Sequence, residues 1–137
     1  QAGGIDLALC GVGIDGHVAF NEPPRLLSGQ VTAEEFGASL TRLVPLTPES
    51  IIMNGTRNMG GNLADFPPMG VTLGMGDILA SQRIRLYCPG GTWQRSVLRQ
   101  AALGDQTVNC PVTLLQNHPD YALFADRDTA APPGMGV

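Results

Sequence analysis

Residues 5–17 read IDLALCGVGIDGH, an apolar run that leads directly into a glycine-rich segment. The run from Ile5 to Cys10 is short and nearly continuously apolar, which is typical of a central strand buried on both faces of a sheet. Glycines at positions 11, 13 and 16 follow the run. Because open α/β sheets place their sites at the carboxyl ends of strands, this glycine-rich loop is the first candidate for a functional site.

Further strands and helices alternate along the rest of the chain. Apolar runs at 69–73, 84–88 and 121–125 predict three more strands. Helices are expected at 32–36, after Thr47-Pro48, at 77–81, at 111–116, and after Thr92, which is expected to cap a helix that buries Trp93, Val97, Leu98 and Ala101. This order predicts an α/β fold with a mostly parallel sheet flanked by helices, an open, Rossmann-like three-layer sandwich.

Length and composition exclude several functions. With 137 residues the chain has room for one domain, and we expect it at 1–130, with a loose tail at 131–137. All eight basic residues are arginine, which excludes a lysine Schiff base within this stretch. The formal net charge is -4 and no basic run occurs, so nucleic acid is not expected as a partner. No membrane segment is expected, and three widely spaced cysteines indicate reduced thiols in the cytoplasm.

The glycine-rich loop permits two interpretations. Gly11, Gly13 and Gly16 spell G-x-G-x-x-G, the pattern of a dinucleotide site, with Glu34 or Glu35 about twenty residues further on. Two features of the sequence oppose that interpretation. The prolines at 23 and 24 leave little room for the helix whose N-terminus would bind the pyrophosphate, and the acid at 15 would lie beside that group.

The other interpretation concerns the acids and the histidine in the same loop. Asp15, His17 and Glu22 lie within eight residues. Imidazole exchanges protons near neutral pH, and flanking carboxylates can fix its tautomer, so this group predicts acid–base chemistry. A purely structural role, in which His17 bonds the backbone of its own loop and the acids cap turns, is the alternative.

The string GVGIDGHVAFNEP resembles the central motif of the glucosamine-6-phosphate deaminase family, within the superfamily that also contains 6-phosphogluconolactonase. VTLGMGDIL and LLQNHPDYALFAD are similar to later segments of the same family, so the resemblance extends from Gly3 to about Asp128. The ending Asn21-Glu22-Pro23 favours the amino-sugar branch over the lactonases. The resemblance implies that this chain is the C-terminal part of a larger domain.

The resemblance also implies roles for single residues. His17 becomes the acid–base group that opens the sugar ring, with Asp15 and Glu22 in support. Arg57 matches the arginine that binds the substrate phosphate, and the three glycines are expected to lie against the substrate. A family lysine that also binds phosphate is replaced here by Gln94, which leaves a neutral hydrogen-bond donor at that position.

Function is therefore expected to be conversion of glucosamine 6-phosphate to fructose 6-phosphate and ammonia, without a metal or another cofactor. The family's proton-transferring aspartate lies upstream of the matched region, so this fragment alone is expected to be inactive. The full-length form is expected to be a homo-oligomer that binds a small sugar phosphate. A galactosamine-6-phosphate isomerase, a lactonase-like hydrolase and a non-catalytic sugar-phosphate-binding module are the alternatives.

Overall fold

The computed structural model describes residues 3–24 and 31–132. Its strands are β1 (Leu7–Cys10), β2 (Arg42–Pro45), β3 (Met69–Thr72), β4 (Arg83–Cys88) and β5 (Tyr121–Ala125). Its α-helices are α1 (Ala33–Gly37), α2 (Pro48–Asn58), α3 (Met75–Leu79), α4 (Arg95–Leu103) and α5 (Arg127–Ala130), and its 3-10 helices include η2 (Gly91–Gln94) and η3 (Pro111–Asn117). The five residues expected to form most of the tail, 133–137, lie outside the described part.

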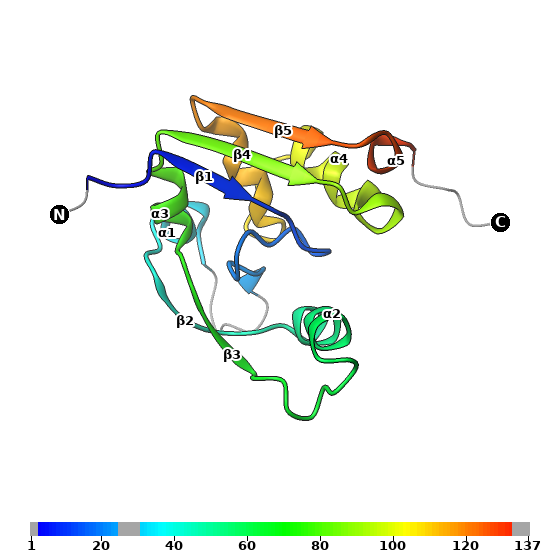
Figure 1. Ribbon diagram of the computed structural model, residues 1–137. Coiled ribbons are helices and arrows are strands. Elements are labelled where there is room, and N and C mark those ends of the chain that lie inside the picture. The colour runs from blue at the N-terminus through cyan, green and yellow to red at the C-terminus, as the bar shows by residue number, and fades with distance from the viewer. Residues whose placement is uncertain (1–2, 25–30, 133–137) are drawn as a thin grey trace.

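A parallel sheet forms the centre of the molecule, in the order β1-β4-β5 (Figure 1). Leu7 of β1 pairs with Arg83 of β4, and Ile84 pairs with Tyr121 of β5. The predicted strands at 84–88 and 121–125 agree with β4 and β5. The α/β fold with a parallel sheet flanked by helices is therefore confirmed.

The hydrophobic core lies on one face of this sheet. Ile84, Leu86 and Cys88 alternate along β4 and are completely buried on this face. Helix α4 and η3 pack on the same side, below the sheet in Figure 1. They contribute a set of buried side chains, namely Val97, Leu98, Ala101, Val112, Leu114 and Leu115. Burial of this alternating face explains why the β4 sequence forms a strand.

The opposite face of the sheet is not covered by the described residues. Leu7 and Leu9 of β1 are 44% and 67% exposed, and Tyr87 of β4 stacks on Phe124 of β5 at the surface. The prediction that the first strand is central and buried on both faces is wrong for this structure. The reason is positional, because β1 is an edge strand and its outward side chains meet no helix within 3–24 and 31–132.

The segment at 69–73 forms a strand, but outside the parallel sheet. β3 pairs antiparallel with β2, so that Arg42 lies opposite Thr72 and Pro45 opposite Met69. Helix α2 lies between these two strands in the sequence and begins as predicted, with Thr47 as N-cap and Pro48 in the first turn. The β2–β3 pair thereby places α2 opposite the loop that follows β1 (Figure 1).

The start of α4 differs from the prediction. Thr92 is not its N-cap, because residues 91–94 form the 3-10 helix η2 and α4 begins at Arg95. Gly91, the first residue of η2, has φ +69°, a left-handed conformation that favours glycine. Trp93 therefore lies in η2 rather than on the buried face of α4. The other expected helices form, with α3 beginning at Met75, two residues before the predicted turn. No helix in the described ranges has the length and apolar character needed to cross a membrane.

Candidate active site

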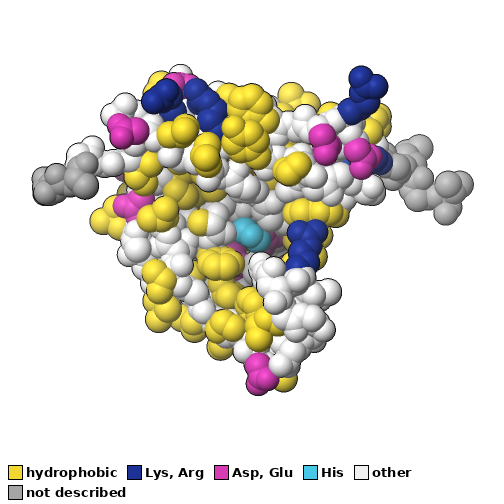
Figure 2. Space-filling model, in the orientation of Figure 1, with side chains coloured by type: hydrophobic (Ala, Val, Ile, Leu, Met, Phe, Trp, Pro, Cys, Tyr) yellow, Lys and Arg dark blue, Asp and Glu magenta, His cyan; other side chains and the backbone are white. Residues whose placement is uncertain are grey.

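A cavity of about 310 Å³ opens between the loop that follows β1 and helix α2. Such a volume is at the small end of the range for small-molecule sites. Figure 2 shows this face hollowed, with a histidine side chain at the bottom of the hollow. The loop contributes Gly11, Val12, Gly13, Ile14, His17 and Ala19, α2 contributes Glu49, Ser50, Met53, Asn54 and Arg57, and η2 contributes Trp93.

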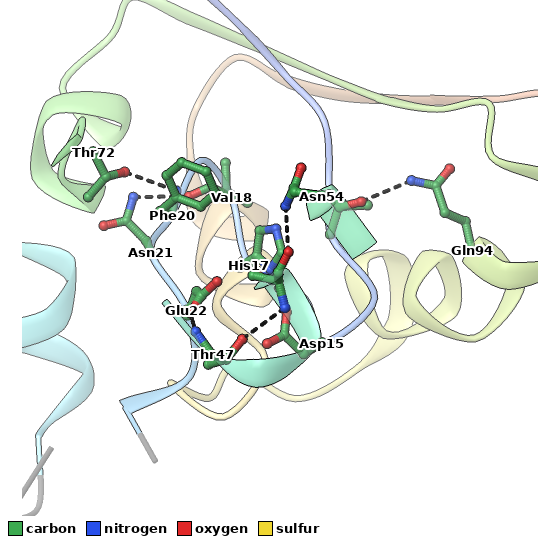
Figure 3. A network of polar contacts seen from close by, with 12 residues as sticks. Asp15, His17, Val18, Phe20, Asn21, Glu22, Thr47, Asn54, Thr72 and Gln94 are labelled. Carbon is green, nitrogen blue, oxygen red and sulfur yellow. Dashed lines mark hydrogen bonds and ion pairs between the residues drawn. The ribbon is translucent and has the colours of Figure 1, made fainter. Parts of the chain in front are cut away.

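Asp15 and His17 form a hydrogen-bonded pair at this cavity. Oδ1 of Asp15 lies 2.6 Å from Nδ1 of His17 and also accepts the backbone N–H of His17 at 3.2 Å. The side chains are 4% and 16% exposed, so the carboxylate is behind the ring and the ring reaches the cavity. Figure 3 shows the two side chains together. If Nδ1 carries the proton toward Asp15, Nε2 presents a lone pair on the other side of the ring.

The pKa of Asp15 lies below the usual value for an aspartate. Burial by itself raises this pKa, but hydrogen bonds and the charge of His17 act in the opposite direction and together outweigh burial. The pair therefore favours an ionised carboxylate beside the imidazole. An ionised Asp15 accepts a hydrogen bond from Nδ1–H of His17 and so fixes the orientation of the ring.

The glycines have steric roles in holding this pair. A Cβ atom at Gly13 would overlap the imidazole of His17, so the ring lies directly on the backbone there. Gly13 N–H also donates to His17 O at 3.0 Å, which closes the loop on itself. Gly16 has φ +86°, and a Cβ atom on it would lie 2.5 Å from Sγ of Cys110. Gly11 and Gly13 line the cavity, whereas Gly16 packs against Cys110 and does not line it.

Glu22 is not joined to the pair. Its Oε2 accepts the backbone N–H of Thr47, the N-cap residue of α2, and its Oε1 is buried without a hydrogen-bond partner in the described structure. No hydrogen bond or ion pair links Glu22 to Asp15 or His17 within the described ranges. Glu22 lines a second, small hollow together with Arg42 and Thr47. The carboxylate of Glu22 thus lies at the start of α2, the helix that forms one wall of the cavity.

Arg57 and Trp93 line the cavity and contact each other. The Cζ atom of Arg57 lies 4.9 Å from the centroid of the Trp93 ring, a cation–π distance. Arg57 comes from the last turn of α2 and is exposed, as suits a side chain that meets an anionic group. The structure thus brings Arg57 and His17 to one cavity.

Gln94 is near the cavity but does not line it. Its Oε1 accepts the backbone N–H of Gly90 at 2.6 Å, and its Nε2 donates to Val12 O at 2.9 Å. The side chain is 4% exposed. Both ends of the amide are therefore occupied by backbone groups, which departs from the expected role of Gln94 as a hydrogen-bond donor to phosphate. Through these two hydrogen bonds Gln94 links the loop after β4 to the loop after β1 (Figure 3).

Comparison with known proteins adds to this geometry. No protein-family model matches the chain. It is 30% identical over 131 residues to glucosamine-6-phosphate deaminase of Thermoanaerobacter pseudethanolicus, covering 96% of this chain and 47% of the relative. It is 35% identical to the deaminase of Mycolicibacterium smegmatis, covering 96% and 45%. The structure of a monomeric glucosamine-6-phosphate deaminase superposes with a TM-score of 0.76 at 28% identity, covering 91% and 46%.

The resemblance to glucosamine-6-phosphate deaminases is confirmed. The chain spans about half the length of the curated relatives it matches. A 6-phosphogluconolactonase from Trypanosoma cruzi has a TM-score of 0.61 at 20% identity, covering 93% of this chain and 40% of that one, which shows a shared fold.

The conformation of the glycine-rich loop does not fit a dinucleotide site. A dinucleotide site needs a helix that begins at the glycines, yet residues 11–24 contain turns, an isolated bridge between Val18 and Asn21, and no α-helix. The loop instead packs the imidazole of His17 against the backbone of Gly13. Among the described residues no group of three or more histidine, cysteine or acidic side chains is arranged to hold a metal ion.

Sequence reasoning missed four polar or aromatic groups in the cavity, namely Glu49, Ser50, Asn54 and Trp93. Ser50 and Asn54 come from α2, where Nδ2 of Asn54 donates to Ser50 O at 2.9 Å. Ser50 lines the cavity, and its hydroxyl is buried without a hydrogen-bond partner in the described structure. Trp93 was expected in a helix core. The spacing of Ser50, Asn54 and Arg57 at i, i+4 and i+7 on one polar helix face is the signal that was available.

Proposed function

We propose that this chain supplies the ring-opening part of an enzyme that isomerises and deaminates a 2-amino-2-deoxyhexose 6-phosphate. Glucosamine 6-phosphate is the proposed substrate, and fructose 6-phosphate and ammonia are the products. The observation that supports this proposal is the Asp15–His17 pair, with its 2.6 Å contact on one side of the ring and the cavity on the other. The similarity to named glucosamine-6-phosphate deaminases supports the choice of substrate.

The geometry suggests how the ring would open. With Nδ1–H directed at Asp15, Nε2 of His17 accepts the proton of the C1 hydroxyl and returns it to the ring oxygen. The bond between C1 and the ring oxygen breaks, and C1 becomes an aldehyde. Asp15 stays ionised throughout and stabilises the transient imidazolium. The step needs only this proton shuttle, so the proposed ring opening uses no metal and no organic cofactor.

Arg57 is proposed to bind the phosphate of this substrate. Its planar guanidinium offers several N–H donors, which suit phosphate oxygens. It lines the same cavity as His17, so a six-carbon sugar is proposed to place its phosphate at Arg57 and C1 at His17. Asn54 of α2 also lines this cavity and offers polar atoms for sugar hydroxyls.

Parallel assays test the proposal on the protein that contains this chain. Glucosamine 6-phosphate, galactosamine 6-phosphate and 6-phosphogluconolactone are supplied separately, and ammonia, ketose phosphate and acid are measured. We expect ammonia from glucosamine 6-phosphate and its loss on His17→Gln. Acid from the lactone without ammonia would replace the proposal with a lactonase, and binding without turnover would replace it with a sensing module.

A further inference from the structure

The guanidinium of Arg57 lies over the indole of Trp93. The guanidinium carbon lies 4.9 Å from the ring centroid, and both side chains line the same cavity. Within 3–24 and 31–132 no hydrogen bond and no ion pair involves the Arg57 side chain. An arginine with many rotamers would otherwise be free to leave the cavity, so the indole is what defines its position.

Trp93 is not required for the hydrophobic core. Residues Val97, Leu98 and Ala101 form the buried face of the following helix, and Trp93 lies outside the core cluster and is half-buried. Its backbone follows Gly91, whose left-handed φ of +69° directs the chain into η2 at the end of β4. The turn therefore presents a large aromatic side chain toward α2, where Arg57 approaches.

We propose that Trp93 is a positioning residue that holds the guanidinium of Arg57 at the cavity for the phosphate of a sugar phosphate. This inference rests on the proposed function, which assigns a phosphate to Arg57. Because the indole binds the cation without using its N–H donors, all five donors remain available to the phosphate oxygens. A carboxylate in the same place would occupy those donors and compete with the phosphate.

Fluorescence tests the contact without any substrate. Trp93 is the only tryptophan in the chain, so the emission of the protein reports on its surroundings. We expect Arg57→Leu to change the emission intensity or maximum. Arg83→Leu removes an exposed arginine at the far end of β4 and is the matched control, with no change expected. Equal spectra for Arg57→Leu and the unmodified chain would overturn the contact.

Calorimetric binding tests the role of the contact. Glucosamine 6-phosphate and glucosamine are titrated into the unmodified chain, Trp93→Leu and Trp93→Phe. A cation–π contact of ordinary strength at an exposed site corresponds to about twofold to fivefold in affinity. We expect Trp93→Leu to weaken binding of the phosphate ester by that factor and to leave glucosamine unaffected. Trp93→Phe keeps an aromatic face and should recover most of the affinity.

The double variant separates positioning from direct contact with the sugar. In the Arg57→Leu background, Trp93→Leu should have no further effect on glucosamine 6-phosphate, because its partner is already absent. Equal weakening of glucosamine and its phosphate would overturn the proposal in favour of a sugar contact, as would unchanged affinity in Trp93→Leu. If the unmodified chain binds neither ligand, the phosphate role of Trp93 fails, whereas the ammonia assay on the protein that contains this chain still decides the proposed function and the fluorescence result still decides the contact.

Discussion

The imidazole of His17 occupies the space that a Cβ atom on Gly13 would need. The side chain that provides the proposed chemistry is thus pressed against the backbone of its own loop and held from behind by Asp15. A glycine at position 13 is a steric condition for this arrangement. The second glycine of the G-x-G pattern, which also matches a dinucleotide motif, is needed because the His17 ring packs on the backbone of Gly13.

Gly13→Ala should displace the imidazole. Overpacking of this kind costs about 1–3 kcal/mol in the free energy of unfolding, which urea denaturation measures. The chain has two histidines, so the ring signals of His17 and His118 can be followed separately by NMR. We expect the His17 signals to move and those of His118, which bonds Ser81 O, to stay.

Gly11→Ala is the matched control for this change. Gly11 also lines the cavity, but a Cβ atom there meets nothing within 4 Å. Stability and both sets of ring signals should remain as in the unmodified chain. Unmoved His17 signals in Gly13→Ala would show that the ring does not lie on residue 13.

The low pKa of Asp15 predicts a specific acid dependence of stability. Burial alone raises this pKa, but the hydrogen bonds and charge of His17 lower it overall. A carboxyl group whose folded pKa is depressed stabilises the fold above its unfolded pKa of about 3.9, and this stabilisation disappears as the pH falls through the folded pKa. The unfolding free energy of the unmodified chain minus that of Asp15→Asn should therefore shrink as the pH falls below about 4.

Urea denaturation at a series of pH values measures this difference. Asp105→Asn, at an exposed aspartate, controls for the loss of one negative charge. A difference between the unmodified chain and Asp15→Asn that grows as the pH falls would contradict a carboxylate held ionised by His17.

The fold was predictable where the signal is local. Strand β5 has the predicted bounds because its apolar run is bounded by polar residues and turns, and the N-cap Thr47 is followed immediately by Pro48. The pairing of β3 with β2 and the open outer face of β1 depend on contacts between distant residues. No periodicity in the strands themselves encodes such contacts.

In the candidate site, too, contacts between residues close in the sequence were predictable and contacts between distant residues were not. Asp15 and His17 are two residues apart, so their pairing could be inferred from the sequence. Glu22 was grouped with them by proximity in the sequence, but its partner is Thr47, 25 residues away. Trp93 was expected in a helix because its spacing to Val97 fits one, and the left-handed turn at Gly91 redirects it to the cavity.

Glu22 should act on stability rather than on proton transfer. Its carboxylate accepts the N–H of Thr47, which is 3% exposed, and thereby anchors the start of α2. Glu22→Ala leaves that N–H without a partner and should cost about 1–3 kcal/mol in unfolding free energy. Glu22→Gln keeps an acceptor oxygen and should retain most of the stability and the ring-opening activity.

Glu34→Ala, at an exposed acid in α1, is the control and should change little. The measurements are urea denaturation of the chain and the ammonia assay on the protein that contains it. If Glu22→Gln is as stable as the unmodified chain but inactive, the carboxylate takes part in the reaction, and its assignment to the helix start is wrong.

Gln94 should be irreplaceable for structural reasons. Its amide accepts from Gly90 and donates to Val12, and the side chain is 4% exposed. Gln94→Leu leaves both backbone groups unpaired, at about 1–3 kcal/mol for each. Gln94→Lys introduces a charge that cannot accept from Gly90 N–H, so we expect lower stability and no gain in affinity for glucosamine 6-phosphate.

Gln82→Leu provides the comparison, because Gln82 is exposed and its side chain makes no hydrogen bond in the described structure. Urea denaturation should separate the two leucine variants, with Gln94→Leu unfolding at clearly lower urea. Calorimetry with glucosamine 6-phosphate decides the lysine variant. Tighter binding by Gln94→Lys would mean that position 94 reaches the phosphate after all, and that the bonds to Gly90 and Val12 yield when the ligand enters.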